Sequence, residues 1–256
     1  PGTAAGSRPL PALPEDWERC LVVVAHPDDI EYGTAAAVAR WVAQGKQVGY
    51  LLATRGEAGI DSMHPDQAGP LREREQRAAA RAVGVDAVEF LSHRDGVVEY
   101  GLPLRRDIVR AVRRHRPEVM VAGAFTARMV LGLTNQADHR AVGLAVLDAA
   151  RDAGNRWVFP ELTGEGLDPW DGVRAVCFAG AEQPSHGVDV TGDPLERSVD
   201  SLAAHAAYAE GLGEKSVEPR PFLTWAARTA GRAMGVEAAV LFDVHQLIPE
   251  GPPPWE

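Results

Sequence analysis

Four consecutive residues, His26-Pro27-Asp28-Asp29, could bind a metal ion and move a proton. They follow an apolar run at residues 20–25 that predicts a buried, parallel strand ending at the imidazole. Catalytic zinc and similar ions take imidazole and carboxylate ligands and keep one position open for water. Two of these side chains can supply ligands if the loop curls back, and the remaining carboxylate is then placed to act as a general base.

A third ligand has to come from elsewhere in the chain, and His139 has the best context of the eight histidines. It begins a predicted helix after a loop that ends a strand, so it is expected at the same edge of the sheet. Asp138 could cap that helix or orient an imidazole. Without a metal, the tetrapeptide could be a turn whose carboxylate caps the next helix, and Asp138-His139 could be an N-cap beside a surface histidine.

The elements that position these residues alternate between strands and helices. Strands are predicted at 20–25, 48–53, 88–91, 118–122, 173–178 and 188–190, and helices at 34–44, 71–83, 104–115, 139–152 and 194–210. This alternation predicts βαβ units in an α/β, Rossmann-like three-layer fold with a mainly parallel sheet of about five or six strands. Long loops at 54–70 and 123–138 are expected over the carboxyl edge, and the tail is expected to end in a Pro-rich coil.

Length and composition predict one globular domain. The chain has 256 residues, of which 45% are hydrophobic and 24% charged. We expect a flexible, Pro- and Gly-rich N-terminal arm at residues 1–14 and a single domain at residues 15–256. A net charge of −10 argues against a nucleic-acid partner, because phosphates are neutralised by clustered cations.

The cysteine content and the hydropathy of the chain indicate the cellular compartment in which it is expected. Cys20 and Cys177 lie in apolar runs and are expected to be core thiols rather than a disulfide. The sequence contains no apolar run of membrane-spanning length and no convincing signal peptide, so we expect no membrane span and a cytoplasmic location. The oligomeric state is left open, with a homo-oligomer as one option.

Several segments occur in the order found in one known family. They are A-H-P-D-D-I-E-Y-G, T-R-G-E-A-G, R-E-R-E, D-G, R-P-E-V and A-D-H-R-A-V-G, between residues 20 and 145, with weaker similarity near residues 188 and 205. Their order resembles the LmbE-like (PIG-L) family of zinc-dependent N-acetylglucosaminyl deacetylases and related amidases. The combination of H-P-D-D with a later D-H carries most of the specificity.

The resemblance implies roles for individual residues. His26, Asp29 and His139 would hold Zn²⁺ or another divalent transition metal. Asp28 would be the base, and Asp138 would be the aspartate that modulates charge.

Two further positions match residues that bind the sugar or its substituent in family members, namely Arg72 and Asp95. From the residues alone, Arg72 could equally be a solvated helix residue, and Asp95-Gly96 is also an ordinary turn. Both interpretations stay open at this point.

One position departs from the family pattern. The family usually has H-P-D-H where this chain has Gln136-Ala137-Asp138-His139. Gln136 could donate a hydrogen bond to an oxyanion but cannot act as a general acid. Asp28 could then carry the proton both ways, His205 or His64 could substitute, or activity on simple amides would be poor. A structural role for His205 and a mobile surface position for His64 are the alternatives.

The loop before His139 is unusually apolar, with Phe125, Met129, Val130, Leu131 and Leu133. These residues could form a packed loop core. They could otherwise indicate a lipophilic substituent on the substrate, or a partner subunit that covers the site.

The expected function is a metal-dependent amide hydrolase that removes an N-acyl group, in the first instance N-acetyl, from an amino sugar or amino-sugar conjugate. Its partner would be this small molecule. One alternative is an amidase that acts on thiol (mycothiol-type) S-conjugates. Another is a metal-binding protein without catalysis, which Gln136 favours and the retained Asp28 disfavours. A dinucleotide-binding domain is disfavoured because no G-x-G-x-x-G follows the first strand.

Overall fold

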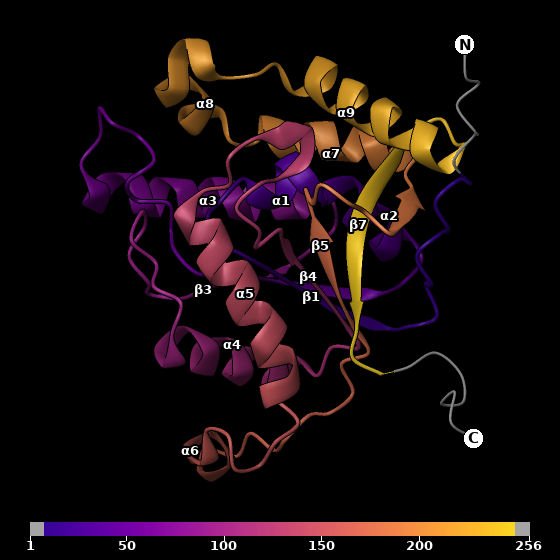
Figure 1. The fold of residues 1–256 in the computed structure, drawn as a ribbon. Helices are drawn as coiled ribbons and strands as arrows, with labels where there is room; N and C mark the ends of the chain where they lie inside the picture. The colour runs from indigo at the N-terminus through magenta and orange to yellow at the C-terminus, as the bar shows by residue number, and fades with distance from the viewer. Residues whose placement is uncertain (1–7, 249–256) are drawn as a thin grey trace.

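A computed structural model describes residues 8–248, and in this range the chain forms one seven-stranded sheet with helices on both faces (Figure 1). The strands are β1 (Arg19–Val24), β2 (Gln47–Leu52), β3 (Ala87–Phe90), β4 (Val119–Gly123), β5 (Ala175–Ala179), β6 (His186–Asp189) and β7 (Ala239–Gln246). The helices are α1 (Asp29–Gly33), α2 (Ala35–Ala43), α3 (Pro65–Ala82), α4 (Leu102–His115), α5 (Ala137–Asp152), α6 (Pro160–Gly164), α7 (Asp193–Ala203), α8 (Ala206–Leu212) and α9 (Pro219–Met234), with short 3-10 turns η1 (Val130–Gly132) and η2 (Gly213–Lys215).

The strand order is β3-β2-β1-β4-β5-β7-β6. Strands β1 to β5 run parallel, and β7 pairs antiparallel with both β5 and β6. The predicted three-layer α/β fold with a mainly parallel sheet is therefore confirmed. The predicted strand number is too low by one, because β7 lies in residues 211–248, for which no element was predicted and where α9 was also missed. The predicted Pro-rich end of the tail lies outside the described residues.

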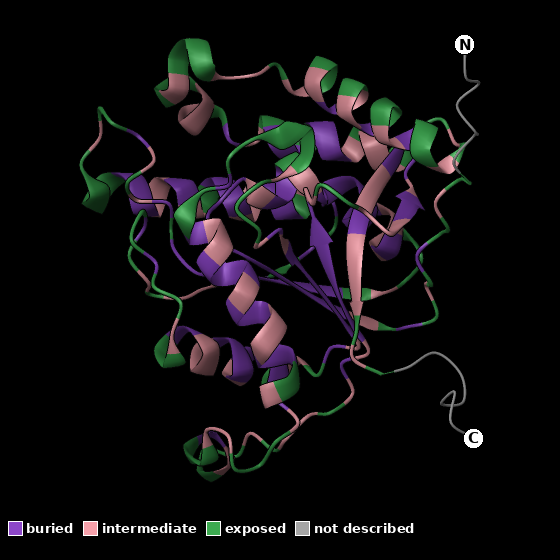
Figure 2. Cartoon of the chain, in the orientation of Figure 1, coloured by how far each residue is buried: buried purple, intermediate pink, exposed green. Residues whose placement is uncertain are grey.

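Strand β1 lies inside the sheet between β2 and β4, and its continuous apolar sequence follows from burial on both faces. Cys20, Val22 and Val24 pack into the core under α1, α2 and α3. Leu21 and Val23 point the other way, into the core under α4 and α5. Figure 2 shows the central strands buried along their length, whereas β7 is largely intermediate in exposure.

The direction of the strand order reverses next to β1. From β1 the chain proceeds outward through β2 and β3, and it then returns to place β4 on the opposite side of β1. In open α/β sheets, ligands bind beyond the carboxyl ends of the strands at such a reversal. The loops after β1 and β4 are therefore where a site is expected.

The second half of the predicted flexible arm is packed. The backbone N–H groups of Leu10 and Leu13 donate to Ala233 and Gly187, and the Leu13 side chain is buried. This pairing covers the outer edge of β6, which would otherwise leave backbone groups unpaired. Residues 1–7 lie outside the described range. We continue to propose one domain for residues 15–256, because a single sheet joins both helical layers.

The predicted loop at 54–70 is partly helical, since α3 begins at Pro65 and includes Pro70. Proline is well tolerated at the first position of a helix, so Pro65 marked a helix start, whereas Pro70 lies inside α3.

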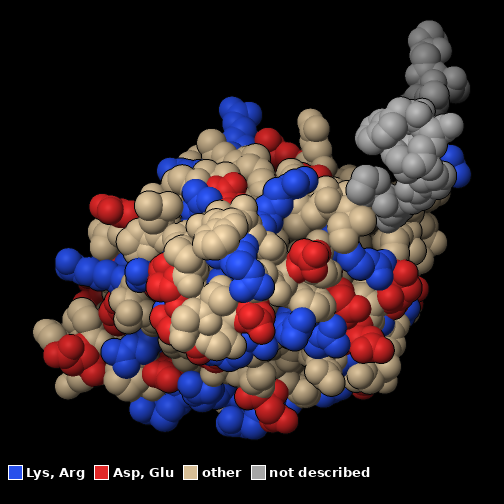
Figure 3. All heavy atoms as spheres, turned by 90° about the horizontal axis from the view of Figure 1, so that it is seen from below, with Lys and Arg blue, Asp and Glu red and all other residues tan. Residues whose placement is uncertain are grey.

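Two surface properties complete the description. Across residues 8–248, no helix has the length and apolar character needed to cross a membrane. On the face seen in Figure 3, positive and negative side chains are interspersed.

Candidate metal centre

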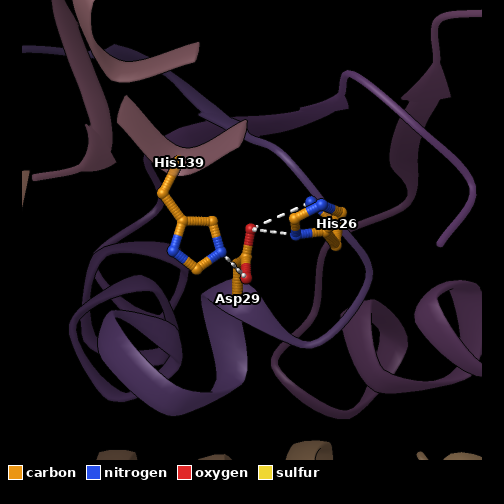
Figure 4. A group of neighbouring side chains, drawn as sticks. All are labelled: His26, Asp29 and His139. Carbon is orange, nitrogen blue, oxygen red and sulfur yellow. Dashed lines mark hydrogen bonds and ion pairs between the residues drawn. The ribbon is translucent and has the colours of Figure 1, made fainter. Parts of the chain in front are cut away.

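The structure brings His26, Asp29 and His139 together at the carboxyl edge of the sheet (Figure 4). One ligand atom from each of them lies within 4.8 Å of the others. Nε2 of His139 is 3.0 Å from Oδ1 of Asp29, and Nδ1 of His26 is 3.6 Å from Oδ2 of the same carboxylate. The three predicted ligands thus have the spacing of a metal site.

The loop after β1 curls back because Asp29 closes it. Oδ2 of Asp29 accepts hydrogen bonds from the backbone N–H groups of Ala25 and His26, at 3.1 and 2.9 Å. Asp28 takes a left-handed backbone conformation with φ of 84° and occupies the N-cap position of α1, but its side chain does not cap the helix. The local chain therefore directs the Asp28 carboxylate away from a simple capping role.

Asp138 orients His26 rather than its sequence neighbour His139. Oδ2 of Asp138 lies 3.1 Å from Nε2 of His26. The same carboxylate accepts the backbone N–H groups of Gly96 and Val98, at 2.7 and 3.1 Å. A carboxylate behind a ligating imidazole sets its tautomer and direction, so Nδ1 of His26 is left to face Asp29.

Asp95 contacts the same imidazole edge. Its Oδ1 lies 3.1 Å from Nε2 of His26, and its Oδ2 accepts the backbone N–H of Ala58 at 2.8 Å. His26, Asp95 and Asp138 also have metal-ligand spacing. Both oxygens of Asp95 and of Asp138 already contact backbone N–H groups or Nε2 of His26, whereas Oδ1 of Asp29 accepts no backbone hydrogen bond in the described part of the chain. We therefore regard this second group as the support of His26.

His139 is oriented by Asn135, which the sequence reasoning missed. Oδ1 of Asn135 lies 3.2 Å from Nδ1 of His139, and its amide nitrogen donates to the carbonyl oxygens of Ala124 and Thr126. The sequence did contain a signal for this role, because Asn135 lies four residues before the ligand and just before a predicted helix. Asn135 thereby couples the end of β4 to the imidazole.

Arg72 is buried beside Asp28 and is 2% exposed. Its Nη2 lies 3.1 Å from Oδ1 of Asp28 and 2.7 Å from the carbonyl oxygen of Pro27. Its Nη1 donates to the carbonyl oxygen of Gly56, and its guanidinium carbon lies 3.7 Å from the centre of the Tyr208 ring. Arg72 is thus not the solvated helix residue that the sequence left open. Its predicted contact with the substrate stays a prediction.

Gly56, in the T-R-G-E motif, makes room for this arginine. A Cβ atom at Gly56 would lie 2.3 Å from Nη1 of Arg72, and the residue has a φ of +64°. Both the close approach and the left-handed backbone require glycine here.

The charges of the site depend on one another. Burial raises the pKa of Asp28 to about 7, although the positive charge of Arg72 opposes this rise. Burial lowers the pKa of His26, but hydrogen bonds to Asp138, Asp29 and Asp95 outweigh that effect and raise it to about 12. Around His26 and His139 there is therefore an excess of carboxylate, which either bound protons or a cation must balance.

Gln136, which occupies the position of the missing histidine, and the two histidines that could substitute for it differ in position. Gln136 is exposed at the N-cap of α5, and its side chain makes no hydrogen bond within residues 8–248. His205 is buried with its Nε2 3.3 Å from Oε2 of Glu31, and the His64 side chain is 71% exposed. This placement favours the structural interpretation of His205 and the surface interpretation of His64.

The apolar loop before His139 divides into two parts. Phe125 packs edge-on against Phe178 with ring centres 4.8 Å apart, so it belongs to the core. Val130, Leu131 and Leu133 are 45, 67 and 56% exposed. The packed-core interpretation therefore holds for Phe125, and a lipophilic substituent or a covering partner at the exposed residues stays a prediction.

Comparison with known proteins places these residues in a family. The family model described as GlcNAc-PI de-N-acetylase (PIG-L) matches residues 21–150, just over half of the chain. A diacetylchitobiose deacetylase of Thermococcus kodakarensis is 26% identical over 196 residues, which cover 74% of this chain and 70% of the relative. A 1D-myo-inositol 2-acetamido-2-deoxy-alpha-D-glucopyranoside deacetylase of Geodermatophilus obscurus is 29% identical over 232 residues, with coverage of 73% and 76%.

The fold also matches solved structures. The structure of N,N'-diacetylchitobiose deacetylase from Pyrococcus horikoshii superposes with a TM-score of 0.81 and 22% identity, covering 91% of this chain and 85% of that one. At this identity the likeness establishes the fold alone.

Proposed function

Because the chain belongs to the GlcNAc-PI de-N-acetylase (PIG-L) family, we propose that it is a metal-dependent hydrolase that removes an N-acetyl group from an amino sugar or an amino-sugar conjugate. The observation that carries this proposal is the convergence of His26, Asp29 and His139 beside the buried carboxylate of Asp28. A purely structural metal site needs no such additional carboxylate.

The donor set suits a divalent transition metal, with Zn²⁺ as our first choice. Two imidazoles and one carboxylate are a common ligand set of catalytic zinc, and His26 is backed by carboxylates as ligating histidines usually are. A dication would also balance the carboxylate excess around the two imidazoles. When bound, such an ion polarises an amide carbonyl and lowers the pKa of water.

Asp28 is the proposed general base. Its carboxylate takes a proton from the attacking water, and a pKa of about 7 suits proton transfer in both directions near neutral pH. Arg72 holds this carboxylate through the 3.1 Å contact and restricts its rotation. We propose that Asp28 then returns the proton to the leaving nitrogen, since Gln136 cannot act as an acid.

Gln136 is proposed to assist the same step without moving a proton. Its exposed side chain lies three residues before the ligand His139 and can donate an amide N–H to the developing oxyanion. Asp95 and Arg72 are retained as proposed contacts of the sugar.

The names of the relatives support an amino-sugar substrate. Both act on an N-acetylated glucosamine unit that carries a second ring, in one case a sugar and in the other an inositol. No observation here favours the S-conjugate amidase.

Acetate release tests the proposal. The zinc-loaded protein is incubated with diacetylchitobiose and with the N-acetylglucosaminyl-inositol, alongside Asp28→Asn and the control Asp66→Asn, whose side chain is 90% exposed. We expect release by the wild type and the control, and a loss of about 10²–10⁴-fold in Asp28→Asn with metal retained. No release by the wild type from any acetylated amino sugar would contradict the function, and near-normal turnover by Asp28→Asn would contradict the base.

A further inference from the structure

The peptide group between Pro27 and Asp28 is held at both of its edges by one helix. Nη2 of Arg72 donates to the carbonyl oxygen of Pro27 at 2.7 Å, and Oε1 of Gln76 accepts the backbone N–H of Asp28 at 2.9 Å. Arg72 and Gln76 are four residues apart on α3, so they lie one above the other on the same face of that helix. The helix therefore fixes the orientation of this peptide plane.

Asp28 needs this constraint because its backbone is strained. Its φ is 84°, in the left-handed region that residues with a Cβ atom rarely adopt. Turning the Pro27–Asp28 peptide plane over would bring this φ to the negative values that such residues prefer. It would also point the carbonyl oxygen of Pro27 away from Arg72. A strained backbone of this kind persists only where its surroundings hold it.

The amide of Gln76 is itself held in one orientation. Gln76 is fully buried, and its Nε2 donates to Oε1 of Glu31 on α1 at 3.0 Å. The hydroxyl of Ser201 on α7 lies 3.2 Å from the same carboxylate oxygen, and Glu31 is 1% exposed. Because a carboxylate accepts hydrogen bonds, it keeps the nitrogen of Gln76 on its side and leaves Oε1 to face Asp28.

The orientation of the peptide group affects the proposed base through Arg72. The same Nη2 that donates to Pro27 also lies 3.1 Å from Oδ1 of Asp28. If the peptide plane turned over, Arg72 would lose the shorter of these two contacts and would hold the carboxylate less firmly. Gln76 has no exposed surface, so it can act on the reaction only through these neighbours.

We propose that Gln76 is a positioning residue for Asp28, which it serves by locking the Pro27–Asp28 peptide plane in the orientation that Arg72 requires. This inference rests on the proposed function. It gives the buried contact between α1 and α3 a role in turnover in addition to its role in packing.

Gln76→Met tests this role, because methionine keeps the length of the side chain and removes both amide contacts. Glu118→Met is the control, since Glu118 also accepts backbone N–H groups beside β1, but at the end of the strand opposite the site. We expect Gln76→Met to retain zinc and to lose about 10–100-fold in kcat. KM should stay nearly unchanged, because Arg72 keeps its contacts with Gly56 and Tyr208. The control should retain normal kcat.

Two further measurements separate positioning from packing. The double variant Gln76→Glu/Glu31→Gln exchanges the amide and the carboxylate, so a hydrogen bond between the two side chains and an acceptor for Asp28 both persist. We expect it to recover most of the kcat that Gln76→Met loses. A crystal structure of Gln76→Met is expected to show a negative φ at Asp28 and the carbonyl oxygen of Pro27 turned away from Arg72.

Several results would overturn the proposal. They are normal kcat in Gln76→Met, a double variant no more active than Gln76→Met, and loss of zinc together with kcat, which would assign Gln76 to support of the metal. If Gln76→Met does not fold, Gln76→Asn replaces it, because its side chain is too short to reach Asp28. Failure of both variants to fold would overturn a role specific to Asp28.

Absence of acetate release by the wild type would contradict the proposed function instead. The crystal structure of the variant then decides about Gln76 alone. A peptide plane that has turned over supports the positioning role, and an unchanged φ at Asp28 overturns it.

Discussion

Nε2 of His26 lies 3.1 Å from Oδ2 of Asp138, and the two residues are 112 positions apart in the chain. The contact joins the loop after β1 to the first turn of α5, which follows β4. It points Nδ1 of His26 at Asp29 and so links the second ligand-bearing segment to the first.

Asp138→Asn is therefore expected to weaken metal binding. The amide cannot reproduce a carboxylate that accepts from two backbone N–H groups and an imidazole, and loss of such a partner costs about 10–100-fold in metal affinity. Competition with a chromogenic zinc chelator measures the change. Asp107→Asn is the control, because Asp107 pairs with His93 at the same 3.1 Å outside the metal group. An unchanged zinc affinity in Asp138→Asn would refute this role.

Arg72→Lys is expected to lower kcat by about 10–100-fold and also to raise KM, because Arg72 is proposed both to hold Asp28 and to contact the sugar. A lysine has no planar fork with which to bind Asp28 and the two loop carbonyls together, and it loses the stacking on Tyr208, so the base is held less well. Steady-state kinetics separates the two parameters. A raised KM with normal kcat would show instead that Arg72 acts only by binding substrate, as the family resemblance implies.

Glu15 provides a test of stability against pH, away from the metal group. It accepts hydrogen bonds from Arg40, Trp41 and Gln44 on or next to α2. Partial burial raises the pKa of Glu15. The hydrogen bonds, of which the one from Arg40 has the largest effect, outweigh this and lower the pKa below its ordinary value of about 4.3. The stabilisation is therefore complete above that value and is lost as the pH falls through the lower folded-state pKa.

We expect Glu15→Gln to reduce the free energy of unfolding by about 1–3 kcal/mol at pH 7, and by less as the pH falls below about 4. Urea denaturation across this range measures the difference. Glu18→Gln is the control, because the Glu18 side chain is 83% exposed. A difference that stays constant or grows in acid would contradict the assignment.

The sequence predicted the position of the site well because the site follows from topology. Residues after β1 and before α5 had to meet once β1 and β4 were adjacent parallel strands with their carboxyl ends at one edge. Only residue types and element order were needed to place His26, Asp29 and His139 there.

Side-chain partners were harder to predict, since they depend on rotamers and loop paths. Asp138 precedes His139 in sequence yet faces His26, because the first turn of α5 directs it toward the loop at 96–98. Asn135 lies in the long loop before α5, whose course has no periodicity, and Tyr208 reaches Arg72 from α8, which is distant in sequence. Strand β7 was missed because Asp243 and His245 interrupt its apolar pattern at the partly exposed end of the sheet.

The central claim is that His26, Asp29 and His139 bind one shared cation, and the metal content of the protein tests it most directly. Wild-type protein, His139→Ala and the control His64→Ala are stripped with chelator, dialysed against limiting zinc and analysed by mass spectrometry of the metal. His139 is 28% exposed in its side chain, so its truncation leaves no deep cavity, and circular dichroism checks the fold. We predict about one zinc ion per chain in the wild type and in His64→Ala, and a near-complete loss in His139→Ala. Full zinc content in His139→Ala would contradict the account.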